Sequence, residues 1–337
     1  MKNLPNLMLV VLFQFTVTFA FGQVDLVQQL IDEGVTKHDS GKYAEAIALY
    51  QRALQLNPTS SVANYEISYS YLMDGDYRNA VKYSRIAIKQ KDDSQLSAYI
   101  TCGSALDMMG KTNRSIKVYE KAMKRYDYYL LYYNHAVSCL VGGKLNKAYN
   151  SAIKAIQDNP SHASSHLILS KIMARKGERV KAMLPLYFFL LLEPDTPRAT
   201  MAYENLRKYM DAGVSEKPGK KIVVSVPVKG MSDFAAAEML LSLAKTTQTL
   251  DKDSTDTDLQ HFAEINEQLF KGLGELKKDH TGFWWDFYVT FFSEMADKGL
   301  SEAYSYYISQ LQGEEATDWF DWHNDDFERF KIWVSVK

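Results

Sequence analysis

Oxygen-bearing side chains alternate along one short acidic segment. Asp251, Asp253, Thr255 and Asp258 present the carboxylates and hydroxyl that Ca²⁺ takes as ligands. The segment lacks the glycine of the sharp turn and the glutamate that closes a calcium loop. Acidic residues that lead into a helix are also stabilised by the helix dipole. We therefore expect a helix start at this segment and no metal site.

Two histidines stand four residues apart, which is a metal-ligand spacing on a helix. His162 and His166 straddle a predicted helix junction after Pro160, and the sequence offers no evident third ligand. We expect both to be solvent-exposed histidines.

Short catalytic motifs are missing from the chain. The sequence contains no Gly-x-Ser-x-Gly nucleophile motif, no phosphate-binding loop and no zinc-protease helix motif. This favours a protein that is not an enzyme and that needs no cofactor. Carboxylates from distant positions can converge without a local trace, so an enzyme with its site in the C-terminal part stays open as an alternative.

The last third of the chain is rich in aromatic residues and carries all five tryptophans: Trp284, Trp285, Trp319, Trp322 and Trp333. Residues 284–295 follow a helical apolar stripe, which is typical of a core. A predicted helix over residues 316–330 has an aromatic face opposite an acidic one, and we expect it to pack inside the protein. Glycan binding by exposed aromatic side chains is the second alternative.

The elements that would position these residues follow a repeat. Gly41, Tyr43, Ala46 and Ala53 are followed 34 residues later by Gly75, Tyr77, Ala80 and Ala87, and Gly110, Gly143 and Gly177 continue the register. A fixed offset of this length is typical of a helix-turn-helix solenoid. We predict five helix pairs, over residues 27–57, 61–91, 96–126, 129–159 and 163–193.

The first copy, with Gly34, Gly41, Tyr43, Ala46, Tyr50, Ala53 and Pro58, resembles the tetratricopeptide repeat (TPR) family. The resemblance implies an all-α solenoid that binds peptides or protein partners in a groove lined by the first helix of each pair. The third and fifth copies depart from the pattern, at Thr112 and Ser115 and at Leu186 and Phe189.

The register predicts which side chains line that groove: Ile31, Val35, Asp39, Tyr65, Tyr69, Met73, Ile100, Ser104, Met108, Tyr133, Val137, Val141, Leu167, Lys171 and Arg175. Tyrosine offers a rigid face with a polar tip and methionine adapts its shape, so both suit recognition. As binding residues we select Tyr65, Tyr69, Met73, Met108, Tyr133 and Lys171. A register error of one residue would place some of these in the core.

The fifth copy requires a cover. Residues 184–192 are nearly all apolar, and a helix that is apolar on all sides is buried on all sides. Pro197 opens a predicted capping helix that runs to about Met210, and we expect this helix to cover the fifth repeat.

Beyond the capping helix the period ends. We expect a linker over residues 214–220 and a helical module over residues 221–337, with helices at about 232–250, 256–277, 283–298, 301–311 and 316–330. The runs Lys221–Val226 and Lys331–Val336 are both rich in β-branched residues, and we predict that they pair as a two-stranded ribbon. The repeats with their cap would occupy residues 23–213.

Composition limits the partner. The chain of 337 residues has 46% hydrophobic residues, 24% charged residues and a formal charge of −2, which is typical of a globular protein. Basic residues form no long block, so we expect no nucleic-acid partner. The two cysteines, Cys102 and Cys139, are expected to be buried thiols.

The N-terminal segment has the pattern of a cleaved export signal. Lys2 precedes a mostly apolar run from Leu7 to Phe21, and small residues stand before a cut after Gly22. We expect a periplasmic or secreted protein with no membrane span in the mature chain. The sequence therefore predicts an exported, non-catalytic scaffold or adaptor of unknown oligomeric state that binds a peptide or protein partner.

Overall fold

The computed structural model describes residues 26–212, 214–217, 221–224, 233–250 and 255–337. The predicted signal peptide, residues 1–22, lies outside the described residues, as do Asp251 and Asp253 of the acidic segment. The described residues form two compact units, which are divided between residues 144 and 145.

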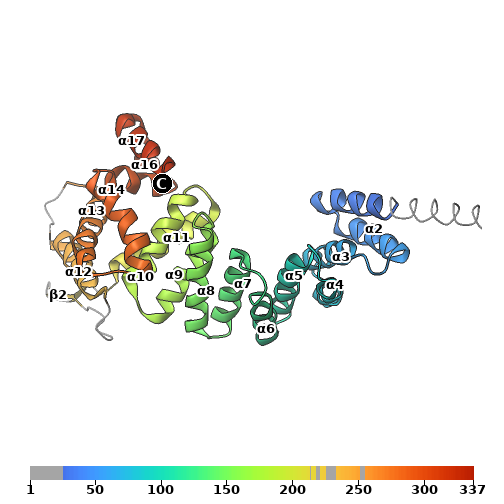
Figure 1. The fold of residues 1–337 in the computed structure, drawn as a ribbon. Coiled ribbons are helices and arrows are strands. Elements are labelled where there is room, and N and C mark those ends of the chain that lie inside the picture. Colours follow the sequence, from blue (N-terminus) through green and yellow to red (C-terminus); the bar gives the residue numbers. More distant parts are fainter. Residues whose placement is uncertain (1–25, 213, 218–220, 225–232, 251–254) are drawn as a thin grey trace, which may run out of the picture. The chain divides into compact units, whose positions relative to one another are not determined.

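The first unit is a run of paired helices (Figure 1). They are a helix over residues 26–39, α2 (Tyr43–Leu56), α3 (Ser61–Met73), α4 (Tyr77–Gln90), α5 (Gln95–Met108), α6 (Thr112–Ala122) and α7 (Tyr129–Val141). Each helix contacts the next one. In addition, α3 contacts α5, and α5 contacts α7. The predicted solenoid of TPR-type helix pairs is confirmed, and the first helices of successive repeats lie side by side.

Glycine explains both the turns and the close packing of the repeats. Gly41, Gly75, Gly110, Gly143 and Gly177 have φ values of 73°, 87°, 70°, 70° and 79°, a left-handed conformation that costs glycine little. Gly34 and Gly103 have another role, because a Cβ atom at either one would overlap the ring of Tyr50 or Tyr119. The fully buried tyrosine thus fills the space that the missing side chain leaves between two helices.

The second unit joins the remaining repeat helices to the C-terminal module. Its elements are α8 (Leu145–Asp158), α9 (Ala163–Lys176), α10 (Arg179–Leu192), α11 (Pro197–Asp211), β1 (Val214–Lys217), β2 (Lys221–Val224), α12 (Ala235–Leu250), α13 (Asp258–Leu276), a 3₁₀ turn η1 (Lys277–Asp279), a π-helical turn η2 (Trp284–Val289), α14 (Thr290–Asp297), α15 (Ser301–Ile308), α16 (Glu314–Trp322) and α17 (Asn324–Ser335). The predicted capping helix is confirmed as α11.

The module shares with α11 the covering of the fifth repeat. Helix α10 is buried along almost its whole length, and it contacts α12, η2 and α15 as well as α9 and α11. Tyr304 donates a hydrogen bond of 2.8 Å to the carbonyl of Tyr187, and Tyr187 in turn donates to Asn266 of α13. The predicted capping helix alone does not cover α10. The cover by α12, η2 and α15 was not predicted from the sequence.

The predicted ribbon is wrong in one strand. Val214–Lys217, expected to be a linker, pairs antiparallel with Lys221–Val224, so that Val214 faces Val224 and Lys217 faces Lys221. Lys331–Val336 instead belongs mostly to α17, which carries Phe327, Phe330 and Trp333 at three-residue intervals. The Trp333 ring lies 5.0 Å from that of Phe291, and this packing holds the segment as a helix.

Two further details of the module differ from expectation. The single helix predicted over residues 316–330 is broken at His323 into α16 and α17. Trp319 and Phe330 of its aromatic face are buried, whereas Trp322 is 83% exposed. The stripe at residues 284–295 is core as predicted, since Trp284, Trp285 and most of its other apolar members are buried.

The histidine pair and the cysteines are at least partly buried. His166 is fully buried, which contradicts the expected exposure, and His162 is half-buried. Cys102 and Cys139 are both buried and form no disulfide, as predicted. None of the described helices is long and apolar enough to cross a membrane.

Candidate functional site

Three aromatic rings stack on the first helices of the first two repeats. The Tyr65 and Tyr69 rings lie one helical turn apart on α3, with centroids 6.3 Å apart and planes within 6° of parallel. The His38 ring also stacks on Tyr69, with centroids 4.8 Å apart, and its Nδ1 is 2.7 Å from Ser70 Oγ. Both tyrosines are half-buried, so their rings are held in place while part of each ring reaches solvent. Two of the predicted binding residues thus form one rigid aromatic surface.

Exposed apolar side chains continue this surface along the array. Met73, Met108 and Val141 are the last residues of α3, α5 and α7, and they are 47%, 61% and 70% exposed. Because the three helices lie side by side, equivalent positions point to the same side of the first unit. Tyr133 is half-buried on α7, in the same register as Tyr65 on α3. We call the surface formed by Tyr65, Tyr69, Met73, Met108 and Tyr133 the first-helix face.

A carboxylate with an unusual pKa lies beside this face. Burial, with a smaller contribution from the charge of Asp39, raises the pKa of Glu66 to about 7. Glu66 is the only charged residue of α3, and it follows directly after Tyr65. Glu66 was not among the residues predicted from the sequence, although a single carboxylate between two tyrosines on an otherwise uncharged helix is a usable signal. Near neutral pH this group can take up or release a proton as its surroundings change.

Repeats three and four are joined by a second carboxylate. Ser115 donates a hydrogen bond of 2.7 Å to Asp107 Oδ2, and Ser138 of α7 also donates to that oxygen. Burial raises the pKa of Asp107, against the effect of these two hydrogen bonds. Asp107 therefore connects α5, α6 and α7.

Not all of the predicted groove residues lie on the first-helix face. Ile31 is 3% exposed and belongs to the core cluster of the first repeat, against which Val35 also packs. Their assignment to the groove is wrong, since the first copy turns these side chains toward α2. Lys171 is exposed on α9, in the second unit.

In the described part of the C-terminal module, the tryptophans and carboxylates are the residues that glycan binding or an enzyme site would use. Trp284, Trp285 and Trp319 are buried, and Trp322 alone among the tryptophans is largely exposed. Burial opposes ionisation of Asp233, but hydrogen bonds from Lys181 and Trp285 hold its pKa below the usual range. The hydrogen bond from Arg207 likewise lowers the pKa of Asp258. Both carboxylates are ion-paired, which suits a structural role.

One group near α13 has metal-ligand geometry. Asp256, His261 and Glu264 bring their ligand atoms within 4.8 Å of one another. Both carboxylates are exposed, and exposed acidic groups are common without an ion. The arrangement therefore does not define a metal centre.

The geometry agrees with a comparison against protein families. A family model described as a TPR repeat matches residues 34–75, which run from Gly34 through α2 and α3 to Gly75. The same helix pair recurs as far as α10. The chain is a tetratricopeptide repeat protein, and an array of this class is a scaffold for protein–protein interaction.

Several solved structures resemble part of the chain. YrrB, a TPR protein with an unusual peptide-binding site, is 18% identical with a TM-score of 0.43, over 53% of this chain and 90% of that one. PilF of Pseudomonas aeruginosa is 17% identical with a TM-score of 0.46, over 56% and 90% of the two chains. MamA from Desulfovibrio magneticus RS-1 is 17% identical with a TM-score of 0.45, over 51% and 98%. No curated protein matches the chain.

Proposed function

We propose that this protein is a non-catalytic adaptor that binds a peptide or helical segment of a partner protein on the first-helix face. The observation that carries the proposal is the parallel stack of Tyr65 and Tyr69, continued by the exposed ends of α3 and α5. Contiguous exposed apolar side chains on a folded unit are typical of interaction sites. Rigid tyrosine rings bury a large area at a low cost in side-chain entropy, so they serve as anchors.

The chemistry of the face defines the partner segment. Apolar side chains of the partner would cover the two methionines, and its backbone or polar groups would meet the tyrosine hydroxyls. Glu66 follows Tyr65 and is close enough to Asp39 to feel its charge, so a basic side chain of the partner would be favoured beside these carboxylates. The partner is thus an apolar segment that carries one basic residue.

A pair of charge-introducing substitutions tests the proposal without touching the core. Met73→Glu/Met108→Glu places two carboxylates on exposed positions of the face, so the fold should persist while partner binding falls at least roughly tenfold. Met201→Glu is the matched control, because Met201 is 64% exposed on α11 in the second unit. Capture from an envelope extract followed by quantitative mass spectrometry would measure retention. A partner retained equally by all three proteins would refute binding at this face.

We also propose that the protein is exported and that residues 23–213 and 221–337 are its repeat and module segments. The support for export is the signal-like pattern that ends at Gly22. Mass spectrometry of the protein purified from the source cells should find Gln23 as its first residue. A chain that retains Lys2 would contradict export by a cleaved signal.

A further inference from the structure

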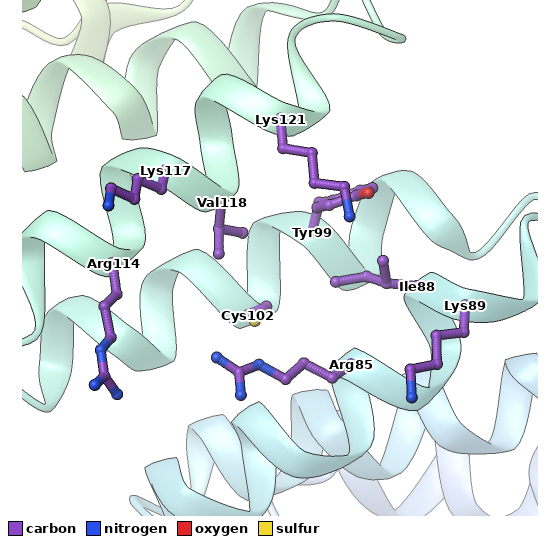
Figure 2. Close-up of a pocket in the computed structure, with 9 residues that line it drawn as sticks. All are labelled: Arg85, Ile88, Lys89, Tyr99, Cys102, Arg114, Lys117, Val118 and Lys121. Atoms are coloured by element: carbon purple, nitrogen blue, oxygen red, sulfur yellow. The ribbon is translucent and has the colours of Figure 1, made fainter.

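A cationic cavity lies in the first unit where the second helices α4 and α6 flank α5 (Figure 2). Its volume is about 760 Å³. Five cationic side chains line it: Arg85 and Lys89 from α4, and Arg114, Lys117 and Lys121 from α6. Ile88, Val118, Tyr99 and Cys102 supply an apolar floor between them. The first-helix face contributes none of these residues.

The positive charge of this cavity is not compensated. No acidic residue lines it, and across the part of the chain that the structure describes none of the five cations forms an ion pair. A neighbouring cavity of about 620 Å³ adds Lys91, Lys124 and Arg125 to the same basic region. Like charges held this close repel one another, and an anionic group would relieve the repulsion. The cavity is therefore suited to a ligand that combines negative charge with an apolar group.

The same chain carries a segment with that combination. Trp322, the last residue of α16, is 83% exposed, which is unusual for so large an apolar side chain. Asp318 lies one turn before it, and Asp321 and Asp325 flank it; all three are exposed. None of the three forms an ion pair with a described residue. The acidic segment, residues 318–325, thus matches the cavity in charge and offers an aromatic ring for its floor.

We propose that the acidic segment of one copy docks into the cationic cavity of a second copy. Trp322 packs on Tyr99, Ile88 and Val118, where the surrounding cations also favour the face of an indole ring. Asp318 and Asp321 pair with Arg114 and Lys117, and arginine can hold a carboxylate with two hydrogen bonds.

The cavity and the segment belong to different parts of the chain, so the contact is head-to-tail. Two copies joined by one such contact keep one cavity and one segment free, so further copies can add until a ring closes. Association should therefore continue with concentration, and salt should weaken it because the charges lie at the surface.

Two complementary variants test the contact. Arg114→Glu/Lys117→Glu disables the cavity and keeps the segment, whereas Asp318→Asn/Asp321→Asn keeps the cavity and disables the segment without giving it a charge that the altered cavity would attract. Sedimentation velocity of the mature chain at about 50 mM NaCl should show a mass that grows with concentration up to about 100 µM. Each variant alone should stay monomeric. An equimolar mixture should form a 1:1 complex that grows no further, because only one intact cavity and one intact segment remain.

The controls separate docking from misfolding and from general charge effects. Lys42→Glu/Arg52→Glu changes the net charge as much as the cavity variant does, at exposed positions of α2 and the turn before it, and should associate like the wild type. Formation of the 1:1 complex itself shows that both variants fold, and about 500 mM NaCl should dissociate it. A wild type that remains monomeric over the whole range, or a mixture without a complex, would overturn the proposal. So would association by either variant alone.

Discussion

Arg179 and Glu238 form a buried ion pair that ties the fifth repeat to the C-terminal module. Arg179 Nε donates to Glu238 Oε2 at 2.7 Å, and neither side chain is more than 8% exposed. Glu238 Oε1 also accepts the backbone N–H of Val180 at 2.7 Å, while Arg179 donates to Ser242 Oγ at 2.8 Å. The pair is thus fully hydrogen-bonded at the junction of α10 and α12.

Removing the carboxylate of this pair should destabilise the second unit. Glu238→Leu leaves the Arg179 guanidinium buried without its counter-charge, and we expect a loss of roughly 3 kcal/mol in urea unfolding. Arg179→Met/Glu238→Leu removes both charges and should recover much of that loss. Glu267→Leu breaks an exposed pair with Lys271 and should change little. A double variant less stable than Glu238→Leu would contradict this account.

A second prediction concerns glycine at the helix contact. Gly103→Ala should destabilise the first unit by about 1–3 kcal/mol, because the new methyl group overlaps the fully buried ring of Tyr119. Gly142→Ala is the control, since its nearest neighbours would lie at 3.3–3.6 Å and its φ is −77°. Thermal unfolding of both proteins distinguishes them. Equal transition temperatures would show that the Tyr119 ring moves aside freely.

The raised pKa of Glu66 makes a prediction about pH. The pKa is about 7 in the folded protein and 4.5 in the reference state, so ionisation opposes folding as pH rises through this window. Glu66→Gln should therefore match the wild type at about pH 4 and melt roughly 2–4 °C higher at about pH 8.

Glu45→Gln is the control for this effect. The hydrogen bond from Lys37 lowers the pKa of Glu45, so this substitution should give no stabilisation at high pH. If Glu66→Gln were to shift the melting temperature equally at both pH values, the effect would come from packing and not from ionisation.

The buried histidine allows a test of one hydrogen bond. His166 Nε2 lies 2.8 Å from the carbonyl of Pro160, which can only accept, so Nδ1 accepts from the Tyr288 hydroxyl at 2.7 Å. Tyr288→Phe should cost about 1–2 kcal/mol in urea unfolding, because Nδ1 then remains buried without a donor. Tyr307→Phe removes a hydroxyl that has no hydrogen-bond partner among the described residues, and should cost less. An equal loss of stability in the two variants would show that the hydrogen bond to His166 is not the cause.

The repeat region could be predicted closely because its signals are local. Each turn glycine adopts a positive φ, and α2, α8 and α10 end just before Pro58, Pro160 and Pro194, where the sequence places the ends. The register also placed Tyr65, Tyr69 and Met73 on one helix face. It failed at Ile31, because an N-terminal helix packs against only one neighbouring repeat and its inner face becomes core.

The C-terminal module was harder to predict because its structure depends on distant contacts. The β-branched residues of Lys331–Val336 favour a strand locally. In the helix, however, Trp333 packs on Phe291, and this distant contact favours the helical conformation. The cationic cavity was missed for a similar reason. Arg85 and Lys117 lie on different helices, and only the repeat packing brings them to the same cavity.

The burial of α10 has a consequence for how this protein can change in length. Solenoids grow and shrink by duplication or loss of whole repeats, which requires that each end can stack on another copy. Here the last repeat helix, α10, is enclosed by α11 and by the module, and Tyr187 forms hydrogen bonds with Asn266 and Tyr304. A repeat inserted after α10 would separate these partners and expose a helix that is apolar on every side. Variation in repeat number among related chains should therefore occur before the fifth repeat.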